Sequence, residues 1–457
     1  MGAHVIDLVM LKNNFGTAEM REIWKDTNRL RQHLKIEGAL AQAEGELGII
    51  PSAAAQKIQA ATQTTTNYSV EDIAAEAARI KHSFMATINA IQKEAGAAGE
   101  YVHFGATTQD IVDTGAMLQL KQSYLLIRKE VQDIIERLAK ASKSYQYTTM
   151  VGRTHGMQAL PTTFGYKLAV WLDEFGRHLE RLLEMKDRVF VGNLNGAIGS
   201  YASFGPQGIE VEKRTLELLE LGVPTISWQS ARDRFSEYAS VLALISGTLG
   251  KIGNEFYNLM RTEINELEEG FSKGKIGSST MPHKRNPAAF EGLASLTPAV
   301  LKSVALIHES MHVEHERDAM SWRLEWIALP EINIYVSAQL ASLKAILGDL
   351  RVNEAGMRTN LERQQGLLLS EKVMFEVGKK LGKQTAHHLV YECAMQAFEE
   401  QRLFAEILLE QPQIAKNYTK AEIEAWLVAD DYIGLAAEKV DQVIAHLKER
   451  KLLKEQG

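Results

Sequence analysis

Apolar residues recur at alternating spacings of three and four over long parts of the chain. One such run occupies the second hundred residues, with apolar side chains at Met117, Leu120, Tyr124, Ile127, Val131, Ile134, Leu138 and Ala141. This spacing follows the 3.6-residue turn of an α-helix and places the apolar side chains in one stripe. The run therefore predicts a long helix that packs against others in an antiparallel bundle.

Four further segments predict helices of the same kind. The second follows Pro161 and the third includes Tyr238 to Leu259, while a fourth begins at Pro287 and a fifth near Pro330. Helices of roughly 30 residues would be about 45 Å long at about 1.5 Å per residue. Apolar residues extend beyond one narrow stripe on these rods, which predicts a homo-oligomer with bundled central helices.

The remaining segments also favour helix. Residues 18–47 predict one helix, residues 70–95 predict short helical pieces, and beyond about residue 362 the helices shorten. Nine prolines and few β-branched runs agree with this pattern. The chain is thus predicted to be all-α, and its 457 residues are enough for two or three domains.

Composition and charge narrow the class of protein and its expected cellular location. An apolar fraction of 45% and a charged fraction of 24% are typical of soluble globular proteins. The net charge of -7 argues against non-specific nucleic-acid binding. The single cysteine, Cys393, excludes a disulfide framework. With no signal-peptide pattern and no uncharged apolar run near the roughly 18 residues of a membrane span, we expect a cytoplasmic protein with no membrane partner.

Three polar, glycine-bearing stretches interrupt the helical pattern: Gly105–Asp110, Gly152–Gly156 and Gly277–Pro287. Each lies where a long helix starts or is about to start. Loops at the ends of a bundle commonly carry function. Three such stretches containing Thr, Ser, His, Arg, Lys and Asn are hard to explain by packing alone.

The third stretch reads Gly-Ser-Ser-Thr-Met-Pro-His-Lys-Arg-Asn-Pro. Asn286 is expected to cap a helix whose first residue is Pro287, and a helix N-terminus attracts anions. With Lys284 and Arg285 nearby, this loop is either a carboxylate or phosphate cradle that contains a serine, or an ordinary surface connection.

The residue types in these stretches fit one kind of chemistry. Threonine hydroxyls, Asn286 and Lys284 can hold carboxylates, and His155 can exchange a proton near neutral pH. A serine becomes a base only when its anion is stabilised, here by Lys284 and the helix N-terminus. Fixed donors stabilise the charge that develops on a carboxylate when a neighbouring carbon loses a proton. Together these roles describe a β-elimination.

Gly277–Pro287 matches GSSxMPxKxN, the signature of the fumarase/aspartase superfamily, and the other two stretches resemble its remaining signature regions. The resemblance covers essentially the whole chain. It implies three mostly helical domains, 1–110, 111–362 and 363–457, with a long five-helix bundle in the middle. It also implies a homotetramer with a twenty-helix core and active sites that each draw on three subunits. The implied substrate is a small dicarboxylate, and neither a cofactor nor a metal is expected.

The same resemblance assigns roles position by position. Ser278 corresponds to the general base, His155 to the general acid, and Glu291 to the carboxylate that pairs with this histidine. His82 resembles a second active-site histidine of adenylosuccinate lyases. The predicted substrate-binding residues are His82, Thr107, Thr108, Thr154, Ser279, Met281, Lys284, Asn286, Arg317 and Arg323. For Arg317, a salt bridge within the bundle is the alternative.

Two branches of the superfamily share features with this chain. Gly152–Gly156 and Pro161–Gly165 are similar to adenylosuccinate lyase. Phe15–Thr17, Ser227–Arg234 and His315–Trp326 look like bacterial 3-carboxy-cis,cis-muconate cycloisomerase.

Two tryptophans argue against a purine nucleotide as the substrate. Trp228 stands in the place of a substrate-contacting glutamine, and Trp326 in that of a phosphate-binding arginine. Adenylosuccinate is therefore expected to be a poor substrate.

The favoured function is a lyase, most simply a C–N lyase, that eliminates fumarate from an N-substituted aspartate or a related succinyl compound. A cycloisomerase-like enzyme is the first alternative. A catalytically silent structural homologue is the second, and the joint presence of Ser278, Lys284, Asn286, Thr154 and His155 argues against it.

Overall fold

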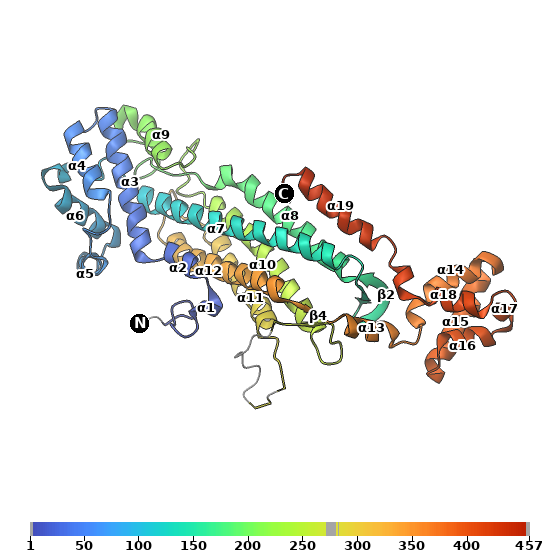
Figure 1. Ribbon diagram of the computed structural model, residues 1–457. Helices are drawn as coiled ribbons and strands as arrows, with labels where there is room; N and C mark the ends of the chain where they lie inside the picture. Colours follow the sequence, from blue (N-terminus) through green and yellow to red (C-terminus); the bar gives the residue numbers. More distant parts are fainter. Residues whose placement is uncertain (1–2, 271–279, 282, 454–457) are drawn as a thin grey trace. The chain divides into compact units, whose positions relative to one another are not determined.

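The computed structural model describes residues 3–270, 280–281 and 283–453 (Figure 1). Ser278 and Ser279 lie outside the described residues. The five predicted periodic segments form five long helices: α7 (Thr108–Ser144), α8 (Phe164–Val189), α10 (Asp233–Leu259), α11 (Ala288–Glu309) and α12 (Met320–Asp349). The predicted all-α class is confirmed, and only short strands accompany the helices in the described part of the chain.

The predicted apolar stripes form the core between these helices. Met117, Leu120, Leu168, Phe175, Leu242 and Ile245 are completely buried. Trp171 of α8 packs edge-on against Phe256 of α10, with 5.4 Å between ring centroids, and Phe256 also lies 5.4 Å from Phe290 of α11. Edge-to-face aromatic pairs of this kind add specific geometry to apolar burial.

A polar cluster joins three of the long helices where the sequence has small residues. Ser246 on α10 donates a hydrogen bond to Gln339 Oε1 on α12 at 2.7 Å. Gln339 Nε2 donates to Thr297 Oγ1 on α11 at 3.0 Å. Because the buried polar atoms satisfy one another, the cluster fixes the mutual register of α10, α11 and α12.

Helix boundaries correct two predictions. Residues 18–47 form two helices, α2 (Ala18–Ile23) and α3 (Asp26–Glu46). They separate because Lys25 is extended and Asn28 Nδ2 satisfies the carbonyl of Ile23 at 2.8 Å.

The fifth long helix begins at Met320, well before Pro330. Asp318 caps it by accepting the backbone N–H groups of Met320 and Ser321 at 2.6 and 3.0 Å. Pro330 lies inside the helix, where it removes one backbone hydrogen bond.

The chain divides into two compact units, each of which contains parts of the long helices. The first unit comprises Met1–Val131, His178–Gly250 and Ser295–Ala341. In it, α3 packs against α4 and α9. Its shorter helices, besides α2 and α3, are α1 (Lys12–Phe15), α4 (Ser52–Thr62), α5 (Val70–Ile80), α6 (Ser83–Ala95) and α9 (Gly208–Leu218), with the 3-10 helices η1 (Gly96–Tyr101) and η2 (Gly205–Gln207).

The second unit comprises Gln132–Arg177, Lys251–Ala294 and Ser342–Gly457. Val373, Val377, Leu389 and Phe404 are among the buried residues of its own apolar core. Its helices are α13 (Glu354–Glu362), α14 (Ser370–Leu381), α15 (Lys383–Glu400), α16 (Phe404–Glu410), α17 (Pro412–Ala415), α18 (Lys420–Trp426) and α19 (Ala436–Glu449), with η3 (Leu367–Leu369) and η4 (Ala429–Tyr432). The domain boundaries at residues 110 and 362 stay predictions.

Two antiparallel strand pairs in this unit depart from a purely helical pattern. β1 (Thr149–Thr154) pairs with β2 (Met157–Thr163), and β3 (Leu267–Glu268) pairs with β4 (Arg351–Val352). The stretch Gly152–Gly156 was predicted to lie where a long helix is about to start. It forms the end of β1 and the two-residue tip of the β1–β2 hairpin, and α8 follows β2.

Among the described residues, α11 is the one helix long and apolar enough to pass for a membrane span. Core helices of soluble bundles have the same composition. Phe290, Leu293, Val300 and Ile307 of α11 are completely buried in the protein.

Candidate active site

A cavity of about 490 Å³ in the first unit brings together residues that lie far apart in the sequence. His82 is the cap of α6, Thr108 begins α7, and Arg317 and Arg323 lie just before and within the first turn of α12. All four were predicted to bind substrate. The full lining is Lys81, His82, Ser83, Phe84, Thr108, Gln109, Val112, Arg317, Asp318, Ala319, Trp322, Arg323 and Trp326.

Three basic side chains line the cavity. Lys81, Arg317 and Arg323 line it, and none of them forms an ion pair within the described residues. The carboxylate of Asp318 is occupied by the backbone N–H groups that it caps. Burial opposes its charge, but these N–H groups outweigh burial and hold the pKa of Asp318 below its usual value. Such a cavity favours an anionic ligand with carboxylate groups.

The threonines at the start of α7 are held in a defined position. Arg317 Nη1 donates to Thr107 Oγ1 at 3.2 Å. Asp110, completely buried, accepts the backbone N–H groups of Thr107, Asn195 and Gly196 at 2.9, 3.1 and 3.0 Å. Burial raises the pKa of Asp110 to about 7, and the three N–H groups oppose this rise. These bonds set Thr107 and Thr108 at a helix N-terminus, where an anion is favoured.

His82 has one ring nitrogen committed to the backbone. Its Nδ1 accepts the N–H of Met85 at 3.1 Å and so caps α6. A nitrogen that accepts a hydrogen bond carries no proton, so the neutral imidazole has its hydrogen on Nε2. Nε2–H is therefore left as a donor for a ligand in the cavity that His82 lines.

The predicted general acid lies in the second unit, at the tip of the β1–β2 hairpin. His155 and Gly156 are the two residues between the paired Thr154 and Met157, with φ of 53° and 78°. Two positive φ values match the tight turn that right-handed strand twist prefers. Thr154 and His155 are both exposed.

A buried ion pair anchors this hairpin. Arg153 Nη1 and Nη2 contact the two carboxylate oxygens of Glu266 at 2.9 and 2.7 Å. Glu266 is completely buried and also accepts from Asn360 Nδ2 at 2.8 Å. A Cβ at Gly152 would lie 2.9 Å from the carbonyl oxygen of Leu160, so the irregular register here needs glycine. The residues before the tip thus hold Thr154 and His155 in place.

The other predicted site residues of this unit surround the start of α11. Met281, Lys284, Asn286 and Glu291 are exposed. Among the described residues no ion pair joins Glu291 to His155, so their pairing stays a prediction.

The start of α11 corrects one expectation. The helix begins at Ala288, one residue later than predicted. The backbone N–H groups of Ala289 and Phe290, in the first turn of the helix, donate to Glu269 Oε1 at 2.6 and 2.9 Å. A carboxylate of the protein itself therefore occupies the helix N-terminus that was expected to cradle an anion.

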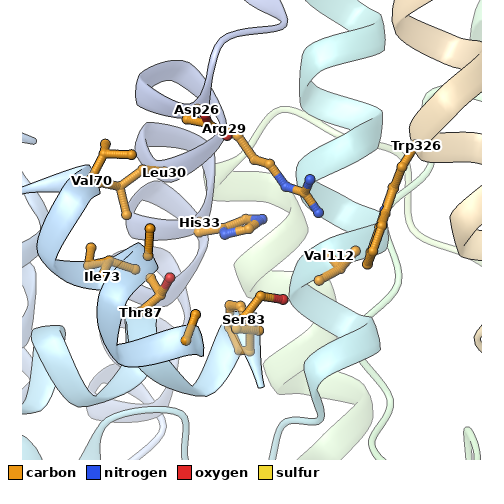
Figure 2. Close-up of a pocket in the computed structure, with 13 residues that line it drawn as sticks. Asp26, Arg29, Leu30, His33, Val70, Ile73, Ser83, Thr87, Val112 and Trp326 are labelled. Atoms are coloured by element: carbon orange, nitrogen blue, oxygen red, sulfur yellow. The ribbon is translucent and has the colours of Figure 1, made fainter. Parts of the chain in front are cut away.

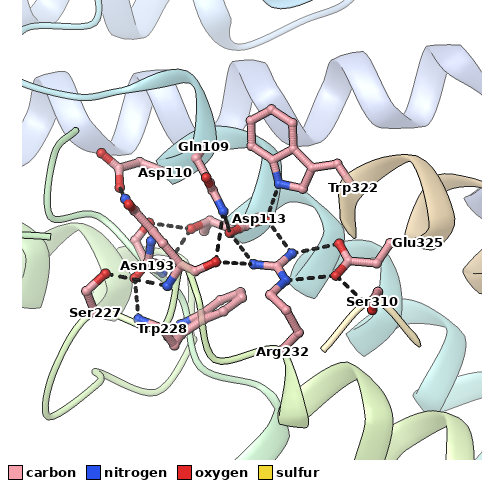
Figure 3. A network of polar contacts seen from close by, with 12 residues as sticks. Gln109, Asp110, Asp113, Asn193, Ser227, Trp228, Arg232, Ser310, Trp322 and Glu325 are labelled. Atoms are coloured by element: carbon pink, nitrogen blue, oxygen red, sulfur yellow. Dashed lines mark hydrogen bonds and ion pairs between the residues drawn. The ribbon is translucent and has the colours of Figure 1, made fainter. Parts of the chain in front are cut away.

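Sequence reasoning missed a buried network beside the first-unit cavity (Figure 3). Arg232 pairs with Asp113 through Nη1 at 2.7 Å and with Glu325 through Nη2 at 2.6 Å. Trp322 Nε1 donates to Asp113 Oδ1 at 3.2 Å. Because Trp322 also lines the cavity, the network positions its wall. The sequence signals were opposite charges far apart in the chain, two of which, Arg232 and Glu325, lie in segments that resemble the cycloisomerase.

Trp228 does not line any of the cavities described here. It is 2% exposed, and its Nε1 donates to the carbonyl oxygen of Gly192 at 2.7 Å. The guanidinium of Arg232 stacks over its ring, with Cζ 5.3 Å from the ring centroid. Trp228 therefore holds Arg232 in the network through a cation–π contact.

Comparisons with known proteins agree with this picture. A family model described as "Lyase" matches residues 14–301, and one described as "Adenylosuccinate lyase C-terminus" matches residues 366–443. The chain is 69% identical to N-acetyl-S-(2-succino)cysteine lyase of Enterococcus italicus and 61% identical to that of Dickeya dadantii, covering 100% of both chains in each case.

A solved structure resembles the fold closely. The 3-carboxy-cis,cis-muconate lactonizing enzyme from Pseudomonas putida matches with a TM-score of 0.90 and 36% identity, covering 96% of this chain and 98% of that one. These findings confirm the family that the signature predicts. The chain belongs to the fumarase/aspartase superfamily of lyases.

Proposed function

We propose that the protein cleaves the carbon–sulfur bond of N-acetyl-S-(2-succino)cysteine or a close thioether, releasing fumarate and a thiol. The observation that carries this proposal is the full-length identity of 69% and 61% to two lyases of that name. The first-unit cavity supports a succinyl substrate, since its cations Lys81, Arg317 and Arg323 match two carboxylates.

The predicted residues suffice for the elimination. Ser278 takes a proton from the CH₂ carbon of the succinyl group, next to a carboxylate. That C–H electron pair forms the new C=C bond, and the C–S bond breaks with its electrons on sulfur. His155 gives the sulfur a proton. Lys284 and Asn286 hold the carboxylate on which charge develops, which lowers the barrier most when the donors are fixed in advance.

We expect a homotetramer in the cytoplasm. In such an assembly the predicted residues of the two units, and Ser278, come together from three subunits at each site. The elimination requires no cofactor, since a base, an acid and carboxylate donors complete it.

Arg317→Met is expected to weaken substrate capture. The change removes a cation that also holds Thr107, so kcat/KM should fall about 10- to 100-fold, the value of one charge-assisted hydrogen bond. Steady-state kinetics of fumarate release would measure the loss, and Arg317→Lys should recover part of it. Unchanged kinetics in Arg317→Met would remove this residue from the site.

His155→Asn is expected to lower activity in a pH-dependent way. A histidine can give a proton only in its protonated form, and that form becomes scarce well above the ordinary histidine pKa of about 6.5. The loss in kcat should approach the 10²- to 10⁴-fold range of a general acid at low pH and shrink toward about pH 10. His388→Asn, on the exposed face of α15, should behave as wild type throughout. A loss that is equal at every pH would contradict protonation of sulfur by His155.

The direct test is product stoichiometry. Purified protein incubated with N-acetyl-S-(2-succino)cysteine should release fumarate and free thiol in equal amounts. The absence of both products would overturn the proposed substrate.

A further inference from the structure

A second cavity, of about 390 Å³, adjoins the candidate site (Figure 2). The two cavities share Ser83, Phe84, Val112 and Trp326 in their walls. The remaining lining of the second cavity is Asp26, Arg29, Leu30, His33, Val70, Ile73, Ala74, Ala77 and Thr87. A ligand that occupied both cavities would pass along this common wall.

Most of this lining is apolar, and one cation projects into it. Figure 2 shows the guanidinium of Arg29 lying between His33 and Trp326. Its Cζ is 4.9 Å from the Trp326 ring centroid. His33 adds no charge, because burial, helped by Arg29, lowers its pKa to about 3. The chamber thus combines apolar walls with a single stacked guanidinium.

The N–H donors of the Arg29 guanidinium are available to a ligand. Among the described residues its guanidinium makes no hydrogen bond and no ion pair, and Asp26, which also lines the cavity, acts on it only from a distance. Burial lowers the pKa of Arg29, while Asp26 raises it. A half-buried guanidinium with five N–H donors and no bound acceptor is poised for a planar, bidentate anion such as a carboxylate.

We propose that this cavity, the Arg29 chamber, holds the leaving group of the reaction and that Arg29 binds its carboxylate. The leaving group is then a small acylated amino acid that carries a thiol. Its carboxylate lies on Arg29, and its acyl group lies against Leu30, Ile73 and Phe84. The size of the chamber is within the range that holds small organic ligands. This inference rests on the proposed thioether lyase function and adds the residue that selects the leaving group.

The test removes the two partners of the contact one at a time. Wild type, Arg29→Met and Arg29→Lys are assayed with N-acetyl-S-(2-succino)cysteine and with its analogue in which the cysteine carboxylate is a carboxamide. Arg29→Met should lower kcat/KM for the acid about 10- to 100-fold and leave the amide within about twofold. Arg29→Lys should lie between. Equal losses on acid and amide would overturn the assignment.

Arg31→Met is the matched control. Arg31 lies on the same helix, is exposed, and donates to Asn28 Oδ1 at 3.1 Å outside the chamber. The same substitution there should change neither substrate. A loss at Arg31 as large as at Arg29 would mean that any charge on this helix matters, which contradicts a specific contact.

A second variant adds charge without disturbing the helix. Ser83 begins α6, where an aspartate is favourable to folding. Ser83→Asp places a negative charge on the shared wall and should reduce kcat/KM for the acid more than for the amide. Ser83→Asn, neutral and similar in size, should not discriminate. Equal effects of the two variants would contradict an anion in the chamber.

A binding measurement tests the carboxylate site of the Arg29 chamber independently of catalysis. If wild type releases no fumarate from the thioether, the function fails, and calorimetry with N-acetylcysteine and N-acetylcysteinamide decides the inference. Tighter binding of the acid to wild type, lost in Arg29→Met, supports the chamber as a carboxylate site. Equal binding of acid and amide overturns it.

Discussion

Ser278→Ala should abolish fumarate release while the protein folds and assembles as wild type does. The alanine cannot take the carbon-bound proton, and the loss is expected to reach about 10⁴-fold, the upper end for one positioned base. Substrate binding should survive, because the proposed carboxylate contacts come from Lys284, Arg317 and the threonines. Initial rates, an equilibrium binding assay and the oligomer mass would measure the three parts of this expectation.

Ser272→Ala is the control for Ser278→Ala. It makes the same change six positions earlier in the sequence. It should retain activity. An active Ser278→Ala protein would show that another group is the base, and loss of substrate binding would show that Ser278 mainly holds the substrate.

Arg232→Met should produce the largest loss of stability. The side chains of Arg232, Asp113 and Glu325 are 0%, 2% and 4% exposed. Removing the guanidinium leaves two carboxylates buried without a cation, which typically destabilises a protein by about 3–5 kcal/mol. Chemical denaturation would measure this loss. Activity should fall with it, because Trp322 is held by the same network and lines the site.

Two comparisons separate buried charge from packing. The triple variant Arg232→Met, Asp113→Asn, Glu325→Gln removes all three charges and should recover a large part of the lost stability. Arg188→Met breaks an exposed pair with Glu237 and should leave the denaturation midpoint unchanged. Wild-type stability in Arg232→Met would contradict the structural role of the network.

The sequence predicted the long helices because their apolar period extends over many turns. Part of the lining of the first-unit cavity coincides with residues that the family resemblance assigned to substrate binding, namely His82, Thr108, Arg317 and Arg323. The hairpin was missed because its tip, His155-Gly156, uses a histidine at positive φ, an uncommon conformation for a side chain other than glycine.

Contacts between distant segments could not be predicted from local pattern. Glu269 caps the N-terminus of α11. Arg29 of α3 contacts Trp326 of α12, although the two residues lie near opposite ends of the first unit's sequence. Two of the three segments that resemble the cycloisomerase meet through Arg232 and Glu325 in a buried ion pair. These two residues therefore belong to the buried framework of the first unit.

The proposed substrate of this lyase is a succinyl thioether. The most direct measurement compares kcat/KM for N-acetyl-S-(2-succino)cysteine, adenylosuccinate and 3-carboxy-cis,cis-muconate with the same enzyme preparation. We expect the thioether to be preferred over the other two substrates by at least about 100-fold in kcat/KM, or about 2.7 kcal/mol. Faster turnover of adenylosuccinate, or formation of a lactone from the muconate at a comparable rate, would contradict it.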